Sequence, residues 1–223
     1  MRSQINGLNQ AVNNANDAIG LIQTAEGAMT ETHSMLQRMK TLTTQAANGT
    51  YTDVARKNIQ AEINALNKEI DRIANTTEFN GEKPLAPAKK GANLTFFIGA
   101  SSAKDNQMTV AQQTMTAQYL TINNITVINT EKALVAMTAV DNAISHVSAY
   151  RATLGAAQNR LEHTVNNLKV TSENITSAES RIRDTDMADE ITAYTKNNIL
   201  LQAAQSMLSQ SNAMPQGVLS MLQ

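Results

Sequence analysis

Apolar residues recur at alternating steps of three and four along the first 47 residues, which is the spacing of a heptad seam on one long helix. We expect this helix to span residues 3–47 and to stop before Gly49. At about 1.5 Å per residue it would be about 65–70 Å long, so it needs a partner along its length. Two polar residues, Glu26 and His33, occupy expected seam positions. The apolar seam residues are Ile5, Leu8, Val12, Ala15, Ile19, Ile22, Met29 and Leu36, followed by Met35, Met39, Leu42 and Ala46.

Two further segments carry matching seams. Residues 52–74 open with a candidate N-cap at Thr52. Residues 131–180 form a second long pattern, in which Arg151 and Gln158 take apolar positions and are expected to fix the register. Three amphipathic helices with matched seams predict a mainly α fold, an elongated bundle of long antiparallel helices. The seams are Ile59, Ile63, Leu66, Ile70 and Ile73 in the shorter segment, and Met137, Val140, Ile144, Val147, Leu154, Leu161, Val165, Leu168 and Ile175 in the longer one.

The region of about 79–110 has a different pattern, which predicts a small β-hairpin region. Asn80 and Gly81 form a turn signal, and Pro84 and Pro87 exclude a continuing helix. Two β-prone runs, 94–98 and 107–110, are joined by residues 99–106, as in a hairpin. Residues 110–130 are rich in Thr, Gln and Asn, and we expect them to be irregular.

The tail, residues 181–223, forms a separate segment. A dense run of charges predicts a bend or a helix restart at residues 184–186, and residues 191–212 then predict a helix with a broad apolar stripe. The long helices already satisfy one another's seams, so this stripe has no mate and is a candidate interaction surface. The residues expected to make polymerisation or chaperone contacts are Ile199, Leu200, Leu201, Ala204, Met207, Leu208, Val218 and Leu219.

Composition favours thin interfaces between helices. The chain of 223 residues is 42% hydrophobic, but it has no Trp, 3 Phe and 4 Tyr, so its apolar content is mostly aliphatic. A net charge of −1 without a basic patch argues against a nucleic-acid partner. No apolar run is long enough to predict a membrane span, and residues 1–10 lack the apolar core of a secretory signal. The absence of Cys excludes disulfides and thiolate metal sites.

The sequence offers no pattern that supports catalysis, a cofactor or a metal site. The three His residues are far apart and have no ligand neighbour at helical spacing, so the first is interpreted as a core or register residue. The acidic cluster lacks the Gly and the distal Glu of a calcium loop and is interpreted as a solvated bend. Nucleotide-binding and nucleophile motifs are absent, so an enzyme is the least favoured class. The residues considered are His33, His146 and His163, and Asp184, Asp186, Asp189 and Glu190.

Five segments resemble the bacterial flagellin family. Three lie in the first half of the chain: residues 1–29 (MRSQINGLNQAVNNANDAIGLIQTAEGAM), 36–50 (LQRMKTLTTQAANGT) and 59–80 (IQAEINALNKEIDRIANTTEFN). Two lie near its end: residues 178–190 (AESRIRDTDMADE) and 199–223 (ILLQAAQSMLSQSNAMPQGVLSMLQ). The resemblance extends over nearly the whole chain except residues 84–130, and the matching segments are specific to this family.

The resemblance implies a structural subunit of the flagellar filament, exported to the cell exterior without a cleaved secretory signal. Residues 1–180 would form the core domain, and residues 181–223 would form the C-terminal half of the inner tube. In the family that half pairs with an N-terminal helix, and this sequence begins inside the family pattern. We therefore expect a short form without variable outer domains, whose head-to-tail assembly into a filament fails without that helix.

The resemblance also implies a binding module as an alternative. An export chaperone would take the apolar helix of the tail, and the flagellin-sensing Toll-like receptor would contact a patch on the first two helices. In that patch Lys40 stands where the family has a second Arg and Thr41 where it has an acidic residue, which weakens the case for receptor activation because Lys lacks the bidentate fork of Arg. Contact with neighbouring subunits is the equally supported interpretation. The patch residues are Leu36, Gln37, Arg38, Leu42, Gln45 and Glu62.

Overall fold

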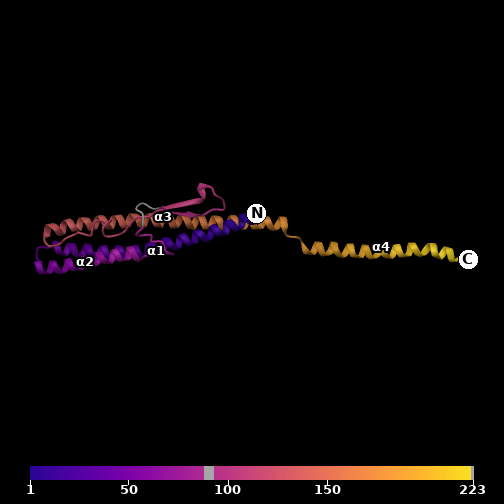
Figure 1. Cartoon of the computed structure of the whole chain (residues 1–223), viewed down its shortest axis with the longest axis horizontal. Coiled ribbons are helices and arrows are strands. Elements are labelled where there is room, and N and C mark those ends of the chain that lie inside the picture. The colour runs from indigo at the N-terminus through magenta and orange to yellow at the C-terminus, as the bar shows by residue number, and fades with distance from the viewer. Residues whose placement is uncertain (88–92, 222–223) are drawn as a thin grey trace. The chain divides into compact units, whose positions relative to one another are not determined.

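The computed structural model describes residues 1–87 and 93–221, with side chains up to residue 212. The chain forms two compact units, Met1–Ile175 and Thr176–Gln223. The helices are α1 (Arg2–Ala47), α2 (Asp53–Thr76), α3 (Thr130–Arg183) and α4 (Met187–Met221), and the strands are β1 (Asn93–Phe97) and β2 (Gln107–Ala111) (Figure 1). The boundary between the units falls near the end of α3, five residues before the expected one.

In the first unit α1, α2 and α3 lie side by side, and α3 runs antiparallel to α1 (Figure 1). Three polar contacts show this direction, because the residue number of the partner in α3 decreases as the residue number in α1 increases. They join Asn9 to Ser172 at 3.1 Å, Glu26 to Arg151 at 3.5 Å and Lys40 to Asp141 at 2.7 Å. The predicted fold class, a mainly α bundle of long antiparallel helices with a small hairpin region, is confirmed.

Many of the buried positions of α1 and α3 carry small side chains. In both helices the buried positions advance in steps of three and four, and Ala alternates with larger residues along much of each line. The backbones of α1 and α2 approach one another closely, whereas α1 and α3 lie farther apart and meet through the larger side chains of these lines. The buried lines are Leu8, Ala11, Ala15, Ala18, Ile22, Ala25, Met29, Thr32, Leu36, Met39, Thr43 and Ala46 in α1, and Ala133, Ala136, Val140, Ala143, Val147, Tyr150, Leu154, Ala157, Leu161, Val165, Leu168 and Ser172 in α3.

This arrangement corrects the predicted seam. Most predicted seam residues are buried, but Val12, Ile19 and Ile144 are only half-buried, and each follows a buried Ala that the prediction left out. Glu26 and His33 in α1, and Arg151 and Gln158 in α3, are likewise half-buried beside the seam and do not interrupt it. Glu26 and Arg151 meet each other across the two helices, at 35% and 31% exposure. The physical reason is that a search for large apolar side chains overlooks Ala, whose value here is its small volume.

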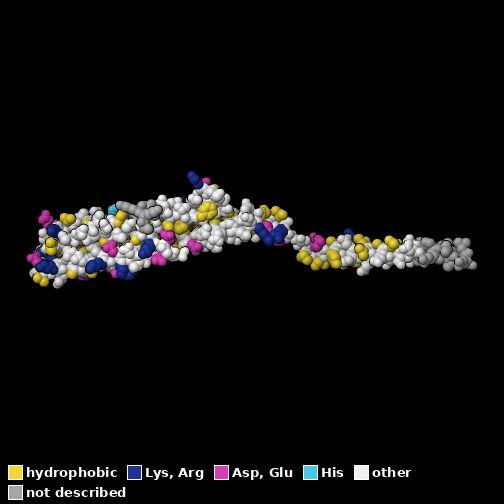
Figure 2. Space-filling model, viewed as in Figure 1, with side chains coloured by type: hydrophobic (Ala, Val, Ile, Leu, Met, Phe, Trp, Pro, Cys, Tyr) yellow, Lys and Arg dark blue, Asp and Glu magenta, His cyan; other side chains and the backbone are white. Residues whose placement is uncertain are grey.

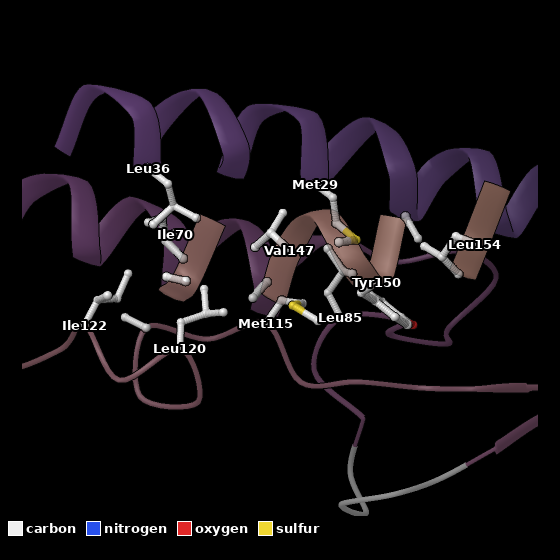
Figure 3. Close-up of a cluster of buried hydrophobic side chains, with 14 of the residues drawn as sticks. Met29, Leu36, Ile70, Leu85, Met115, Leu120, Ile122, Val147, Tyr150 and Leu154 are labelled. Atoms are coloured by element: carbon white, nitrogen blue, oxygen red, sulfur yellow. The ribbon is translucent and has the colours of Figure 1, made fainter. Parts of the chain in front are cut away.

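The irregular segment between β2 and α3 covers the groove left by the three helices. No helix or strand forms between Ala111 and Thr130, as expected. Its side chains nevertheless point into the core, together with one from the segment before β1 (Figure 3). Each is at most 1% exposed, although the Thr-, Gln- and Asn-rich sequence gave no indication of such burial. These core residues are Leu85, Met115, Leu120 and Ile122.

Polar side chains of α2 hold this segment by its backbone. Gln60, Asn67 and Asp71 share one face of α2, because they are seven and four residues apart. Buried backbone groups outside a helix or sheet need partners, and these three side chains supply them as a neighbouring strand would. The bonds are Gln60 Nε2 to Ile125 O (3.1 Å), Val127 N to Gln60 Oε1 (2.8 Å), Asn67 Nδ2 to Ile122 O (2.8 Å) and Ala117 N to Asp71 Oδ1 (2.8 Å).

Arg56 ties the three helices together at the end of α1. Its guanidinium donates to the carbonyl oxygens of Ala46 at 3.0 Å and Asn48 at 3.3 Å, and to Thr130 Oγ1 at 3.1 Å. The side chain is only 10% exposed, and Asp53 lies 3.6 Å from it. Carbonyl groups at a helix end have no partner within the helix, so Arg56 caps α1 and fixes the start of α3 beside it.

The two strands form an antiparallel hairpin in which Thr95 pairs with Thr109. The strands, Asn93–Phe97 and Gln107–Ala111, lie within one residue of the two β-prone runs in the sequence. Asn14 of α1 donates through Nδ2 to the carbonyl oxygen of Phe97 at 3.0 Å, which fastens the hairpin to α1. The predicted turn at Asn80 and Gly81 is also present, with φ angles of 52° and 85°.

In the second unit a short break separates the end of α3 from α4. α3 ends at Arg183 and α4 begins at Met187, so the predicted break at residues 184–186 is present. Asp186 caps α4, because its Oδ1 accepts from the backbone N–H groups of Ala188 at 2.9 Å and Asp189 at 3.4 Å. α4 starts four residues before the predicted helix and continues beyond it.

Enlarging a buried Ala of α3 should destabilise the first unit more than enlarging an exposed Ala of the same helix. Ala143 is 0% exposed in the main core, so Ala143→Leu should lower the free energy of unfolding of the first unit by about 2 kcal/mol. Ala156 lies on an exposed face of α3, and Ala156→Leu is the matched control, with an expected change of less than about 0.5 kcal/mol. Urea unfolding followed by far-UV circular dichroism measures both. Equal effects would contradict close packing at Ala143.

Candidate contact surfaces

The predicted contact residues of the tail form an exposed apolar surface on α4. We call Ile199, Leu200, Leu201, Ala204, Met207 and Leu208 the α4 surface; Val218 and Leu219, also predicted, lie outside the residues whose side chains are described. The large side chains of this surface are between 56% and 71% exposed. Figure 2 shows apolar side chains along the described part of α4, with few charged ones among them. Amphipathic helices of soluble proteins ordinarily bury such a stripe, so this surface fits a partner.

The spacing of these residues makes one broad side of α4 apolar. Leu200, Ala204 and Met207 follow at steps of four and three, with Leu208 next to them, whereas Gln202 lies on the opposite side. Lys196 is the single charged residue within residues 191–212. Burying this side against another helix or in a hydrophobic groove would therefore remove almost no charge from water, which is the costly step in burying polar surface.

A second surface combines residues of α1 and α2, and we call Gln37, Arg38, Gln45 and Glu62 the polar patch. Arg38 Nε donates to Glu62 Oε1 at 2.8 Å, and the two side chains are 54% and 43% exposed. The hydrogen bond to Glu62, together with its negative charge, raises the pKa of the Arg38 guanidinium. Gln45 is held by a bond from its Nε2 to Tyr51 Oη at 2.7 Å. The patch thus presents polar groups whose positions neighbouring side chains fix.

Two residues predicted in the same contact are not available to a partner. Leu36 and Leu42 are 0% and 2% exposed, and both belong to the core between the helices. Leu36 lies on the buried line of α1, and Figure 3 shows it beside Ile70 of α2. The prediction transferred all six positions from the family pattern without regard to which face of the helix they occupy. The accessible contact is therefore the polar patch alone.

A shallow hollow of 800 Å³ adjoins the polar patch, between α1, α3 and the loop after α1. Gln37 and Gln45 line it together with Lys40 and Tyr51. Lys40 Nζ reaches Asp141 of α3 at 2.7 Å, so its charge is already neutralised. A wide hollow of mixed polarity suits a protein contact better than a small molecule, because it encloses little of any ligand.

His33, Asp184 and Asp186, which were considered as metal ligands or catalytic groups, make hydrogen bonds within or at the ends of helices. Nε2 of His33 lies 2.9 Å from Gln37 Nε2, whereas Nδ1 is buried without a hydrogen-bond partner. Asp184 bonds to Ser180, and Asp186 caps α4. In the part of the chain that the structure describes, no three His, Asp or Glu residues gather where they could hold a metal ion. Within residues 1–87 and 93–221, no helix combines the length and the apolar character that a membrane span requires.

The sequence analysis did not find the positioning residues of α2. Gln60, Asn67 and Asp71 hold the irregular segment in place through hydrogen bonds to its backbone. A line of polar residues at steps of seven and four, beside the apolar seam of the same helix, was a visible signal. It was not interpreted, because polar positions on a helix ordinarily face water.

Two family profiles match this chain. The one described as bacterial flagellin N-terminal helical region matches residues 1–90, and the one described as bacterial flagellin C-terminal helical region matches residues 137–222. Together they cover the whole of α1, α2 and α4 and most of α3. The polar patch on α1 and α2 and the α4 surface both lie within the matched residues.

Relatives match over the whole chain. A flagellin of Bacillus subtilis is 47% identical over 255 residues, an alignment that covers 100% of this chain and 83% of the relative. Flagellin FlaB2 of Treponema pallidum is 44% identical over 236 residues, with 100% of this chain and 82% of the relative covered.

Solved structures show the same fold. The crystal structure of Bacillus cereus flagellin is similar with a TM-score of 0.59 and 30% identity, over 75% of this chain and 94% of that one. A putative flagellar hook-associated protein from Vibrio parahaemolyticus has a TM-score of 0.62 at 15% identity, over 78% and 92% of the two chains. The second likeness concerns the fold alone.

Proposed function

The chain belongs to the bacterial flagellin family, and we propose that it joins the flagellar filament by burying its α4 surface against helices of other subunits. As a flagellin it is a structural subunit of an extracellular filament, and its family is one of structural proteins, not of enzymes. We expect the chain itself to catalyse no reaction and to need no cofactor. Residues 1–180 would form the outer layer of the wall and residues 181–223 the inner one.

The observation that carries this proposal is the exposure of α4. Five large apolar side chains in two and a half turns are each more than half exposed, with one charged residue nearby. An isolated surface of this kind is unfavourable in water, and contacts with helices of neighbouring filament subunits would bury it repeatedly along the filament. Packing into a filament therefore accounts for the apolar side of α4.

The same reasoning bears on assembly by residues 1–223 alone. Among the described residues, α1, α2 and α3 have their apolar lines in the core of the first unit and leave no second helix with an unburied apolar side for α4 of a neighbouring copy. We therefore expect that α4 needs a helix from outside these 223 residues and that this chain by itself does not polymerise.

Seeded growth tests this expectation. The purified 223-residue chain, mixed with fragments sheared from native filaments, should leave the fragment lengths unchanged in electron micrographs. Subunits obtained by dissociating the same native filaments are the positive control and should elongate the fragments. Efficient elongation by the 223-residue chain would refute the expectation.

A binding module that serves export is the second candidate function, and the same surface of α4 favours it. An apolar helix side fits the groove of a helical chaperone, which would also shield the subunit from aggregation before export. This interpretation differs from self-assembly in its partner and not in its surface. The two functions would follow one another in time.

A Lys introduced on either side of α4 tests which side contacts the chaperone. Met207→Lys should weaken binding of the chain to a flagellin export chaperone by about tenfold or more, because a buried Lys must lose its hydration. Gln202→Lys adds the same charge on the opposite side and should leave the affinity within about twofold. Isothermal titration calorimetry measures both affinities. If the two variants bind equally well, the apolar side of α4 is not the chaperone contact.

The polar patch supports a third, narrower proposal, contact with the flagellin-sensing Toll-like receptor. Arg38 and Glu62 are accessible and oriented by their mutual bond, but Lys40 is engaged with Asp141. We expect a weak response from reporter cells that express the receptor, and a stronger one after the double substitution Lys40→Arg and Thr41→Glu, which supplies a bidentate donor and a negative charge. An unchanged response would favour neighbouring subunits as the partner of the patch.

A further inference from the structure

A groove of 290 Å³ lies between α1, the turn Phe79–Glu82 and β1, and it shares no lining residue with the polar patch. Its walls combine residues from three stretches that are far apart in the sequence. All three Phe residues of the chain, Phe79, Phe96 and Phe97, line it. In a chain so poor in aromatic residues, their meeting in one surface groove calls for an explanation beyond core packing.

The rings differ in how firmly the fold holds them. Phe79 packs over Gly20 of α1, where a Cβ atom would lie 3.5 Å from the ring. Phe96 is half-buried against the main core, whereas Phe97 is 38% exposed. Phe96 and Phe97 are neighbours on β1, so their side chains point to opposite faces of the hairpin, and Phe97 carries the exposed ring. Exposed aromatic faces attract cations, because the ring quadrupole is negative above and below the plane.

The charges of the groove are negative. Asp17 of α1 and Glu82 of the turn line it, and no Lys or Arg does. Neither carboxylate forms an ion pair with a residue in the part of the chain that the structure describes. Lys83 follows Glu82 but is not among the lining residues. Two carboxylates beside aromatic rings form a site for a positively charged group.

β1 adds a row of backbone groups on the same side. In an antiparallel pair every second residue turns its N–H and C=O groups away from the partner strand. Ile98 N donates to Asn106 O at 2.8 Å, so the alternation turns the backbone groups of Phe97 and Thr95 away from β2. Asn14 already occupies the carbonyl oxygen of Phe97. The backbone groups of Thr95 remain as the edge to which an extended segment could pair.

We propose that this groove binds an extended segment of another protein through an Arg or Lys side chain of that segment. The cationic group enters between the ring of Phe97 and the carboxylates of Asp17 and Glu82, and the backbone of the segment pairs with Thr95. The volume holds one long side chain and is too small for a helix, and the acidic lining excludes phosphorylated or acidic partners. The charge of the groove thus selects a basic, extended partner.

Nuclear magnetic resonance with a defined probe tests the proposal. The peptide acetyl-Val-Thr-Arg-Thr-Val-amide, titrated at low salt into the isotope-labelled 223-residue chain, should shift the backbone signals of Thr95, Phe97 and Asp17 in a saturable way. A dissociation constant of about 1 mM is expected for so few contacts. The same peptide with citrulline in place of Arg keeps the shape without the charge, and its affinity should be lower by a factor of about five or more.

Variants of the chain complete the test. The double substitution Asp17→Asn and Glu82→Gln should weaken the Arg peptide about fivefold or more, whereas Asp105→Asn, at an exposed position of the hairpin outside the groove, should leave binding unchanged. Because none of these positions is in the core, the fold should survive, which the unchanged remainder of the spectrum verifies.

Three results would overturn the proposal. The first is the absence of saturable shifts, and the second is equal binding of the Arg and citrulline peptides. The third concerns the occupant: if sedimentation velocity shows self-association of the chain that the double substitution abolishes and the Arg peptide disrupts, a second copy and not another protein fills the groove.

Discussion

The fold depends on one apolar core that α1 shares with α2 and α3. Most of the stability of helices in proteins comes from packing of an apolar face, so the long helices α1 and α3, of 46 and 54 residues, need such a core along their length. The backbones of α1 and α2 approach one another closely, whereas α1 and α3 meet through side chains, among them Ile22, Met29 and Leu154. Half-buried pairs such as Glu26 with Arg151 then lie beside the contact and hold its register.

α2 and the irregular segment complete the core of the first unit. α2 contributes an apolar line to the core and, on an adjacent face, the amides and the carboxylate that bind the backbone of residues 117–127. In this way a segment without helix or strand becomes as buried as the helices themselves. The hairpin is held through Met108 and Val110, which are part of the same core, and through the bond from Asn14 to the carbonyl oxygen of Phe97.

Much of this fold could be predicted from the sequence, and the errors have physical reasons. The helices were recognisable because their seams are long and their ends carry signals, such as Thr52 before α2 and Asn80 with Gly81 in the turn. The seam was misplaced by one position only in places, because the buried Ala11, Ala18 and Ala25 are small and a search for large apolar residues passes over them. Family resemblance gave residue positions but not their burial, which is why Leu36 was expected at a contact that it cannot reach.

Other features could not be predicted, because they depend on tertiary structure. The groove joins Asp17, Glu82 and Phe97, which no local pattern relates to one another. The burial of residues 110–130 likewise follows from the bonds that α2 offers and not from the composition of the segment. The exposed surface of α4, by contrast, could be predicted, because an apolar stripe almost without charges is visible in the sequence itself.

The two units obtain their stability from different sources, and this difference suits a subunit that must be exported before it assembles. The first unit closes its own core, so its order does not depend on a partner. Complete burial of one large apolar side chain contributes about 1.5–3 kcal/mol. The five large residues of the α4 surface are 56–71% exposed, so covering them offers about 5–10 kcal/mol before the costs of association. A helix in water alone gains little beyond its own hydrogen bonds. Most of the free energy available to α4 is therefore released on association, which couples its final order to assembly.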